Sequence, residues 1–309
     1  MDITIYPRLL RGEITAIPSK SQAHRLLICA AFADCPTEIT CSESNQDIEA
    51  TVACLRALGA EIAETATGYT VRPISSVPTS AVLNCKESGS TLRFMLPIVG
   101  ALGVDGTFTM EGRLAQRPLS PLWEEMERMG CSLSRPTGNA LRCTGKLHSG
   151  EYTIDGGVSS QFITGLMFAH MLMDNCTLTI TGKLESKPYI DMTADALSLF
   201  KERHSPGCVS VEGDWSNGAF WLVANSLGCD LSIHGLVPAS LQGDRAVVDI
   251  LQQLGKGKPT ISAADIPDLI PILSVAAAAK HGAIFTDIQR LRLKESDRVA
   301  STLAMLESF

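Results

Sequence analysis

Clusters of hydroxyl, amide and basic side chains recur along this chain, each at the start of a predicted helix. The residues are Lys20, Ser21 and Arg25 in the first cluster, Arg93 after Ser88, Gly89, Ser90 and Thr91 in the second, and Ser159, Ser160 and Gln161 in the third. Backbone N–H groups at a helix N-terminus favour an anion, and neighbouring cations add to that preference. The pattern predicts one oxyanion-binding site lined by three turns. In the alternative, Ser19 or Ser21 only caps a helix and Lys20 is solvated.

Further candidate residues lie outside these turns. The cations are Arg113, Arg117, Lys187, Arg290, Arg292, Lys294 and Arg298. A guanidinium binds carboxylate or phosphate through two parallel hydrogen bonds, whereas a lysine is a point charge that also transfers protons. Asp268 opens an otherwise apolar stretch, so we interpret it as a catalytic base, with a plain helix cap as the alternative. The six histidines are scattered and no nucleotide-binding or zinc-protease motif is present, so we expect neither a metal nor a cofactor.

The turns belong to a repeat that predicts an α/β fold. Five similar stretches begin near residues 18, 87, 156, 213 and 266, with intervals of 69, 69, 57 and 53 residues. Each is followed by a β-branched stretch and an amphipathic helix, as in TEITC and QDIEATVACLRALG. We therefore expect small α/β modules, grouped into about two domains.

Composition narrows the classes further. The net charge of −7 argues against a nucleic-acid-binding protein, and the longest apolar run, at about 269–279, is too short to span a membrane. No secretory signal is visible after Met1, so we expect a cytoplasmic protein. The ten cysteines include no Cys-x-x-Cys pair, and we interpret them as small buried apolar residues.

Eight strings in order resemble the family of 5-enolpyruvylshikimate-3-phosphate synthases, over essentially the whole chain. They are PSKSQAHR, ESGSTLRF, GRLAQRPL, DGGVSSQF, SKPYID, VEGDWSNGAFW, IPDLIPILSVAAA and RLRLKESDRVA. The resemblance implies the two-domain enolpyruvyl transferase fold, an α/β (α+β) fold with three modules per domain and substrates bound in the cleft between the domains. It places residues 1–19 with 212–309 in one discontinuous domain and residues 20–211 in the other.

The resemblance also implies the activity. The family transfers the enolpyruvyl group of phosphoenolpyruvate to the 5-hydroxyl of shikimate 3-phosphate and releases phosphate, a step of the shikimate pathway toward chorismate and the aromatic amino acids. Both substrates are small molecules, no metal or other cofactor takes part, and we expect a monomer. Glyphosate occupies the phosphoenolpyruvate position in this family, and Gly89 leaves room beside it, so sensitivity is expected.

Site residues are carried over onto matching positions. The catalytic residues implied are Lys20, Asp268 and Lys294. Those implied for shikimate 3-phosphate are Lys20, Ser21, Arg25, Ser159, Ser160, Gln161, Ser186, Tyr189, Asp268 and Lys294, with Arg25 on the carboxylate and the three serines on the phosphate. Those implied for phosphoenolpyruvate are Lys20, Gly89, Arg117, Gln161 and Arg298.

The chain departs from the family pattern in length. The sixth module, which carries an Asn-Asp-His-Arg segment and a further lysine in the family, is missing after Phe309, and the strand and hairpin expected after Phe200 and after Gly255 are missing too. We therefore expect omitted residues at about 200–207, at about 254–260 and after 309, because a helix abutting its neighbour there would leave sheet edges unpaired. Two alternatives stay open: a fragment that binds shikimate 3-phosphate without turnover, and an enolpyruvyl transferase acting on UDP-N-acetylglucosamine. The catalytic cysteine loop of the latter has no counterpart in GRLAQRPL.

Overall fold

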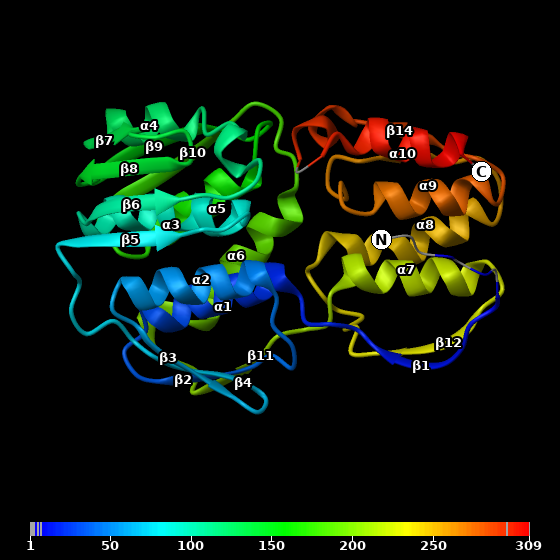
Figure 1. Cartoon of the computed structure of the whole chain (residues 1–309), viewed down its shortest axis with the longest axis horizontal. Coiled ribbons are helices and arrows are strands. Elements are labelled where there is room, and N and C mark those ends of the chain that lie inside the picture. The colour runs from blue at the N-terminus through cyan, green and yellow to red at the C-terminus, as the bar shows by residue number, and fades with distance from the viewer. Residues whose placement is uncertain (1–3, 5, 7, 295, 309) are drawn as a thin grey trace. The chain divides into compact units, whose positions relative to one another are not determined.

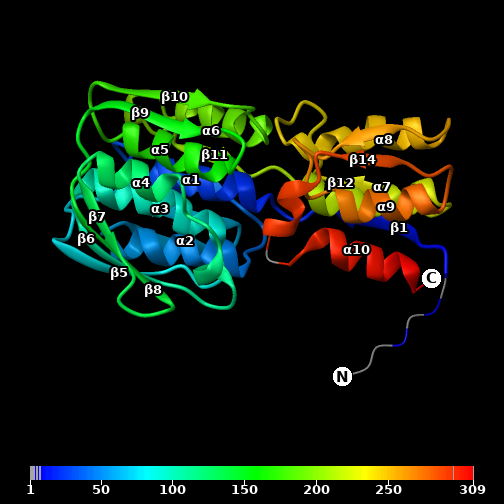
Figure 2. The ribbon, with the colours of Figure 1, turned by 90° about the horizontal axis from the view of Figure 1, so that it is seen from above.

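The computed structural model describes residues 4, 6, 8–294 and 296–308, and its elements are labelled in Figures 1 and 2. By residue number the chain divides into two compact units. Unit 1 comprises 1–17, 212–292 and 296–309, and unit 2 comprises 18–211 with the short segment 293–295. Helices and strands alternate in both units, which confirms the predicted α/β class. None of the helices in the described ranges is both long and apolar enough to cross a bilayer.

The first module of unit 2 is a four-stranded sheet with two helices. Its elements are α1 (Lys20–Ala31), β2 (Thr37–Thr40), α2 (Gln46–Ala57), β3 (Glu61–Thr65) and β4 (Gly68–Arg72). The Asn45 side chain caps α2 by accepting hydrogen bonds from the N–H groups of Asp47 and Ile48, at 3.0 and 3.1 Å. The strand order is β11-β2-β4-β3, in which β11 (Cys208–Ser210) returns from the end of the unit to lie parallel to β2.

The second module repeats this plan. It consists of β5 (Ser80–Asn84), α3 (Gly89–Leu102), β6 (Asp105–Thr109), η1 (Leu114–Gln116), α4 (Leu122–Arg128), β7 (Cys131–Ser134) and β8 (Ala140–Gly145). The order is β5-β6-β8-β7, with β5 parallel to β6 and the hairpin β7–β8 antiparallel. The two sheets therefore have the same sequence of one parallel and two antiparallel pairings.

The third module stops short of this plan. It consists of β9 (Gly150–Asp155), α5 (Ser160–His170), β10 (Cys176–Thr181), α6 (Lys187–Leu199) and η2 (Lys201–Arg203). Strand β9 pairs with β10 in parallel, as β5 does with β6, but this sheet has two strands only. No hairpin follows α6, in agreement with the short repeat interval.

Helices α1, α3 and α5 form the centre of unit 2 and carry its core. Most of their side chains are buried, among them Leu27, Ile28, Phe94, Met95, Phe162 and Phe168. Helices α3 and α5 approach closely at Gly165, where an added Cβ would lie 2.2 Å from the carbonyl oxygen of Arg93. Glycine is therefore required for the two helices to pack at this distance.

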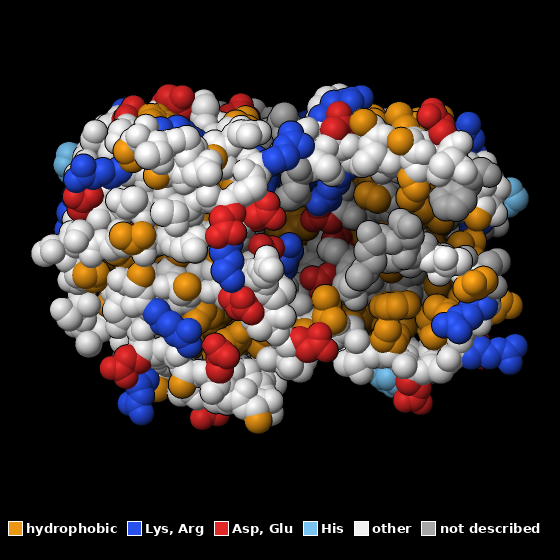
Figure 3. All heavy atoms as spheres, in the orientation of Figure 1, with side chains coloured by type: hydrophobic (Ala, Val, Ile, Leu, Met, Phe, Trp, Pro, Cys, Tyr) orange, Lys and Arg blue, Asp and Glu red, His pale blue; other side chains and the backbone are white. Residues whose placement is uncertain are grey.

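Unit 1 contains two-stranded parallel sheets covered by helices. Its elements are β1 (Arg11–Thr15), α7 (Trp215–Ser226), β12 (Asp230–His234), η3 (Gly243–Ala246), α8 (Val247–Leu254), β13 (Thr260–Ser262), α9 (Ile270–Ala278), β14 (Ile284–Thr286), η4 (Gln289–Leu293) and α10 (Arg298–Glu307). Strand β1 pairs with β12, and β13 pairs with β14. A small core includes Trp215, Ala219, Leu254 and Leu273. Phe220 and Leu227 of this unit stay exposed, and Figure 3 shows apolar side chains around α7.

The chain runs without a break through both internal segments where we expected omitted residues. After α6, the carbonyl of Arg203 accepts from the N–H of Asp34 at 2.8 Å, and the carbonyl of Gly207 accepts from the N–H of Glu38 at 2.8 Å. After α8, the N–H of Gly255 donates to the Leu251 carbonyl at 3.1 Å and a short turn leads to β13. At each of the two positions where the expected hairpin is missing, a hydrogen-bonded turn connects the flanking elements.

The turn at 200–207 is fastened by an ion pair whose strength depends on pH. His204 Nδ1 lies 2.6 Å from Asp34 Oδ2, and the Ser205 N–H donates to Asp34 Oδ1 at 2.9 Å. The hydrogen bond with Asp34 raises the pKa of His204 above its ordinary 6.5, and the hydrogen bond from His204 lowers the pKa of Asp34 below its ordinary 3.8. The stabilisation from His204 is fully present below pH 6.5 and is lost as pH rises through the raised pKa, whereas that from Asp34 is present above pH 3.8 and is lost as pH falls through the lowered pKa.

We expect His204→Gln to lower the unfolding temperature more at about pH 5.5 than at about pH 9, because the ion pair exists only at the lower value. Thermal unfolding followed by circular dichroism at both pH values measures this difference. The matched control is His281→Gln at an exposed position. An equal loss for His204→Gln at the two pH values would contradict the assignment.

Candidate active site

Helices α1, α3 and α5 of unit 2 begin at the three turns that the sequence singles out. Ser19, Ser88 and Ser159 occupy the N-cap positions. The Ser88 side chain accepts from the N–H of Thr91 at 3.2 Å, and the Ser159 side chain accepts from that of Gln161 at 3.3 Å. Ser19 makes no such bond, and its buried hydroxyl oxygen has no hydrogen-bond partner among the residues that the structure describes. The alternative that Ser19 is there to cap α1 is therefore not supported.

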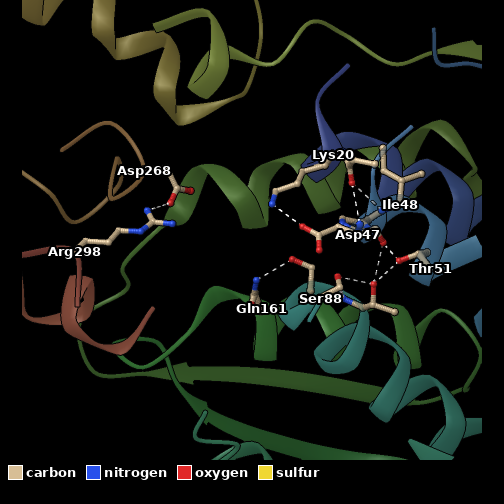
Figure 4. Close-up of polar contacts among 12 residues, drawn as sticks. Lys20, Asp47, Ile48, Thr51, Ser88, Gln161, Asp268 and Arg298 are labelled. Carbon is tan, nitrogen blue, oxygen red and sulfur yellow. Dashed lines mark hydrogen bonds and ion pairs between the residues drawn. The ribbon is translucent and has the colours of Figure 1, made fainter. Parts of the chain in front are cut away.

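Lys20, the first residue of α1, reaches an acidic residue of α2. Its Nζ lies 2.6 Å from Asp47 Oδ2, and its side chain is 53 % exposed (Figure 4). The ion pair orients the ammonium at the N-terminal end of α1 while leaving it accessible. Lys20 is thus held in place and is not a freely solvated surface charge.

Behind this ion pair, a chain of hydroxyl groups connects α1, α2 and α3. His24 Nδ1 lies 2.7 Å from Thr51 Oγ1, which lies 2.7 Å from Thr91 Oγ1, which in turn donates to Ser88 Oγ at 2.7 Å. Burial lowers the pKa of His24 to about 3, with Lys20 and Arg25 acting in the same direction and Asp47 against it. His24 is therefore neutral at physiological pH and serves as a fixed hydrogen-bonding group.

Arg25 is buried among the helices of unit 2, with 2 % of its surface exposed. Its Nε donates to Thr193 Oγ1 at 2.9 Å and its Nη2 to the Tyr189 carbonyl at 2.8 Å, both on α6, while Nη1 donates to the Ser21 carbonyl. The guanidinium also lies over the Phe94 ring of α3, 5.4 Å from its centre. Burial lowers the pKa of Arg25 to about 10, so it remains charged at neutral pH. Most of its donors thus already have protein acceptors.

A second buried arginine organises the contact between α3 and α5. Arg93 Nη1 donates to Gln161 Oε1 at 2.7 Å, and Gln161 Nε2 donates to Ser90 Oγ at 2.9 Å. Gly89 lies against this group, because a Cβ there would be 2.5 Å from Arg117 Nη1 and 2.8 Å from Arg93 Nη1. The backbone at the start of α3 is therefore in direct contact with two guanidinium groups, and any side chain at position 89 would displace at least one.

The residues proposed for a phosphate lie at the starts of α5 and α6. Ser160 is the first residue of α5 and is 5 % exposed, and Ser186 precedes α6 and is 2 % exposed. Ser186 adopts a left-handed backbone conformation, with φ of 57°. A non-glycine residue rarely adopts this conformation outside sites where the surroundings enforce it. Next to it, Lys187 pairs with Asp191 at 2.6 Å, while Tyr189 is half-buried.

Two of the candidate residues in unit 1, one acidic and one basic, form an ion pair. Asp268 Oδ1 and Arg298 Nη1 form a short ion pair with side chains 28 % and 24 % exposed (Figure 4). Asp268 does not cap a helix, since Leu269 holds the N-cap position of α9. Asp297 instead caps α10 by accepting from the Ala300 N–H at 3.0 Å, and it pairs with Arg292 at 2.9 Å. Lys294 follows η4, in the short segment 293–295 that belongs to unit 2, and is half-buried.

Unit 2 brings four of the candidates expected in it into contact with neighbouring polar residues, and it adds residues that sequence reasoning missed. Lys20 is linked through Asp47 to Thr91, while Gly89 lies against Arg117 and Arg93, and Arg93 donates to Gln161. The missed residues are Asp47 and Thr51. Asp47 carried a signal, because an acid or small polar residue opens the second helix of each repeat, and Asp47 lies in the first turn of α2. Thr51 carried none, since its partners His24 and Thr91 lie 27 and 40 residues away in sequence.

Repeated α/β modules whose helix starts carry buried cations and hydroxyl groups define a class, that of α/β proteins that act on anionic small molecules. The sequence model of the EPSP synthase family, described as EPSP synthase (3-phosphoshikimate 1-carboxyvinyltransferase), matches residues 6–309, and the chain belongs to this family.

Relatives agree with this assignment. The chain is 36 % identical to the 3-phosphoshikimate 1-carboxyvinyltransferase of Clostridium kluyveri over 340 positions, covering 98 % of this chain and 80 % of the relative. It is 35 % identical to the enzyme of the same name from Clostridium beijerinckii, covering 99 % and 80 %. The first alignment is longer than this 309-residue chain, so the relative contains internal residues that have no counterpart here.

A solved structure shows the same fold. The EPSP synthase from Acinetobacter baumannii matches with a TM-score of 0.76 at 19 % identity, over 97 % of this chain and 78 % of that one. The fold resemblance expected from the eight sequence strings is confirmed.

The burial of Arg25 predicts that it supports the fold itself. We expect Arg25→Met to lower the free energy of unfolding by about 2 to 3 kcal/mol, because acceptors on α1 and α6 would lose their donor inside the protein. Chemical denaturation measures this loss. The control is Arg142→Met, at an arginine 51 % exposed in a surface pair with Asp105, where little change is expected. A stability unchanged by Arg25→Met would show that these hydrogen bonds contribute nothing.

Proposed function

We propose that this chain catalyses transfer of the enolpyruvyl group from phosphoenolpyruvate to the 5-hydroxyl of shikimate 3-phosphate. The observation that carries the proposal is the similarity, over 98 % of the chain, to relatives that bear the name of this activity. The cations and hydroxyl groups at the starts of α1, α3 and α5 support it, because both substrates are polyanions. As an enzyme of aromatic amino-acid biosynthesis it would act in the cytoplasm, and its free cysteines are compatible with that compartment.

Shikimate 3-phosphate is assigned to unit 2. Its phosphate would accept hydrogen bonds from Ser159, Ser160 and Ser186, and Lys20 would contact the substrate on the side that faces phosphoenolpyruvate. Gln161 and Tyr189 would contact the ring, while Ser21 and Arg25 would hold the carboxylate. Because Arg25 already donates to Thr193, Tyr189 and Ser21, we assign it a second task, that of holding the carboxylate site rigid.

The reaction delivers one proton to the substrates and removes two, so that one net proton leaves with the released phosphate. The methylene carbon of phosphoenolpyruvate takes a proton, the 5-hydroxyl oxygen attacks the resulting cationic carbon, and the hydroxyl proton leaves to a base. The tetrahedral adduct then loses a proton from its methyl group and its phosphate, which restores the enol ether. Lys20 and Lys294 suit proton transfer to and from the substrates, and Asp268 suits the base at the hydroxyl, with Arg298 fixing its orientation.

Phosphoenolpyruvate carries a carboxylate and a phosphate, which call for guanidinium groups. We assign Arg117 and Arg298 to them, with Lys20 and Gln161 beside the reacting carbon. Preorganised cations offset the repulsion between the two substrates and cost no rearrangement during the reaction. Gly89 lets Arg117 approach the start of α3.

Binding without turnover is the second candidate function. The chain spans about 80 % of the length of the curated relatives that it matches. The expected shikimate 3-phosphate residues are all present in the chain, whereas the family's Asn-Asp-His-Arg segment is not.

One titration series tests both candidates. We expect shikimate 3-phosphate to bind, and Ser160→Ala combined with Ser186→Ala to weaken binding by roughly tenfold to a hundredfold, since each serine donates to a charged group. Calorimetry measures the affinity, with exposed Ser132→Ala on β7 as the control. Release of phosphate after adding phosphoenolpyruvate separates the transferase from the binding protein. No binding to the wild-type chain would overturn both candidates, and unchanged binding to the double variant would overturn the phosphate assignment.

Position 89 tests the phosphoenolpyruvate side. We expect Gly89→Ala to raise KM for phosphoenolpyruvate by about tenfold with a smaller change in kcat, because the new methyl group displaces Arg117. Glyphosate inhibition, expected for the wild type, weakens in the same variant. Steady-state kinetics measure both quantities, with Gly138→Ala, where an added Cβ has open space, as the control. An unchanged KM would show that Arg117 does not bind this substrate.

A further inference from the structure

The third sheet of unit 2 ends where the other two continue. In the complete sheets, the strand that follows the first helix of the module, β2 or β6, has a parallel partner on one edge and an antiparallel strand on the other. Strand β10 occupies the equivalent position after α5 and has its parallel partner, β9, but no strand on the other edge. In Figure 2, β10 lies along the outer side of the unit.

The outer edge of β9, by contrast, is covered by side chains of α4. Glu125 Oε1 accepts from the Thr153 N–H at 2.5 Å, and Arg128 Nη2 donates to the Glu151 carbonyl at 2.6 Å. The backbone groups of Glu151 and Thr153 therefore face away from β10. Because the direction of these groups alternates along a strand, residues 150, 152 and 154 face β10.

The same alternation identifies the groups on the open edge of β10. In the parallel register Tyr152 lies opposite Leu178, so residues 177, 179 and 181 bond to β9. The hydrogen bond from the Gly156 N–H to the Thr181 carbonyl, 2.9 Å long, agrees with this direction. The N–H and C=O groups of Cys176, Leu178 and Ile180 therefore point outward, and in the described part of the chain no backbone hydrogen bond reaches them.

We propose that this edge pairs with β10 of a second copy of the chain, antiparallel and centred on Leu178. Pairing around a two-fold axis at Leu178 sets Cys176 opposite Ile180 of the partner, so all three outward-facing residues of each strand find a partner. About six backbone hydrogen bonds form. The result is a four-stranded sheet, β9-β10-β10-β9, in place of two isolated pairs.

The strand itself fits a second copy. An antiparallel strand is what the equivalent edges of β2 and β6 bind within this chain, and a two-fold axis supplies that direction. The segment CTLTIT has no charge, whereas the edge strand β3 carries Glu61 and Glu64, as exposed edges commonly do. Asp174 precedes β10 and Lys183 follows it, so antiparallel pairing brings opposite charges together at both ends. The proposed dimer differs from the monomer expected from the sequence.

The pairing register makes a sharp test possible. In it, the exposed Thr177 lies directly opposite Thr179 of the partner. Thr177→Lys with Thr179→Lys places like charges opposite each other and abolishes the dimer. Thr177→Lys with Thr179→Glu places opposite charges there and keeps or tightens it.

Sedimentation equilibrium of the full chain gives the answer. We expect the average mass of the wild type to rise from 33.0 kDa toward twice that value, over roughly 1 µM to 1 mM, as for a small interface. The doubly lysine-substituted chain stays monomeric, and the Lys and Glu chain follows the wild type. The control is Ser132→Lys with Ser134→Lys on β7, an edge strand of a complete sheet.

Either of two results would overturn the proposal. A wild type that stays monomeric throughout shows that β10 binds no second copy, and a dimer that survives the lysine pair shows that it forms elsewhere. If the lysine variant fails to fold by circular dichroism, Thr177→Glu with Thr179→Glu takes its place. Mixing these two like-charged variants then restores dimers only if the register is as proposed.

Discussion

The arrangement of unit 2 depends on the contacts of one buried charged group, the guanidinium of Arg25. It originates on α1, donates to a side chain and a carbonyl of α6, and lies over an aromatic ring of α3. A buried charge is strongly unfavourable unless its donors are satisfied, so these elements must keep their positions for the charge to be tolerated. The helix starts that carry Lys20, Gly89 and Ser160 are positioned as a consequence. The fold and the candidate site therefore both require that the buried charge of Arg25 keeps its hydrogen-bond acceptors.

That requirement also explains why the polar groups of the site form connected sets. Asp47 orients Lys20, and Arg93 and Ser90 orient Gln161. Few of these side chains are therefore free to change rotamer. A site organised in this way loses little conformational entropy when an anion binds. In the core, the neutral His24 helps to hold the hydroxyl groups of Thr51, Thr91 and Ser88 in place without adding a further cation.

Much of this could be predicted from the sequence, and the rest depended on contacts that no local pattern encodes. Apolar spacing and β-branched runs indicated the helices and strands of each module, and the eight strings indicated the family. The pairing of Lys20 with Asp47 joins residues 27 positions apart, and that of Arg25 with Thr193 joins residues 168 apart, so only the folded chain shows them. The short repeat intervals correctly indicated missing hairpins. The breaks expected there were not found, because a turn held by Asp34 and Glu38 closes the first gap.

Strands that are far apart in sequence pair with each other, and this pairing limits the order in which the protein can fold during synthesis. Strand β1 emerges first, but its partner β12 follows only after more than two hundred further residues. Unit 2 is nearly continuous from Pro18 to Val211 and closes when β11 joins β2. On the ribosome it can therefore complete its sheets while β1 is still unpaired, because domains fold as their residues emerge. The N-terminal strand therefore has to wait for its partner strand while the intervening residues are translated.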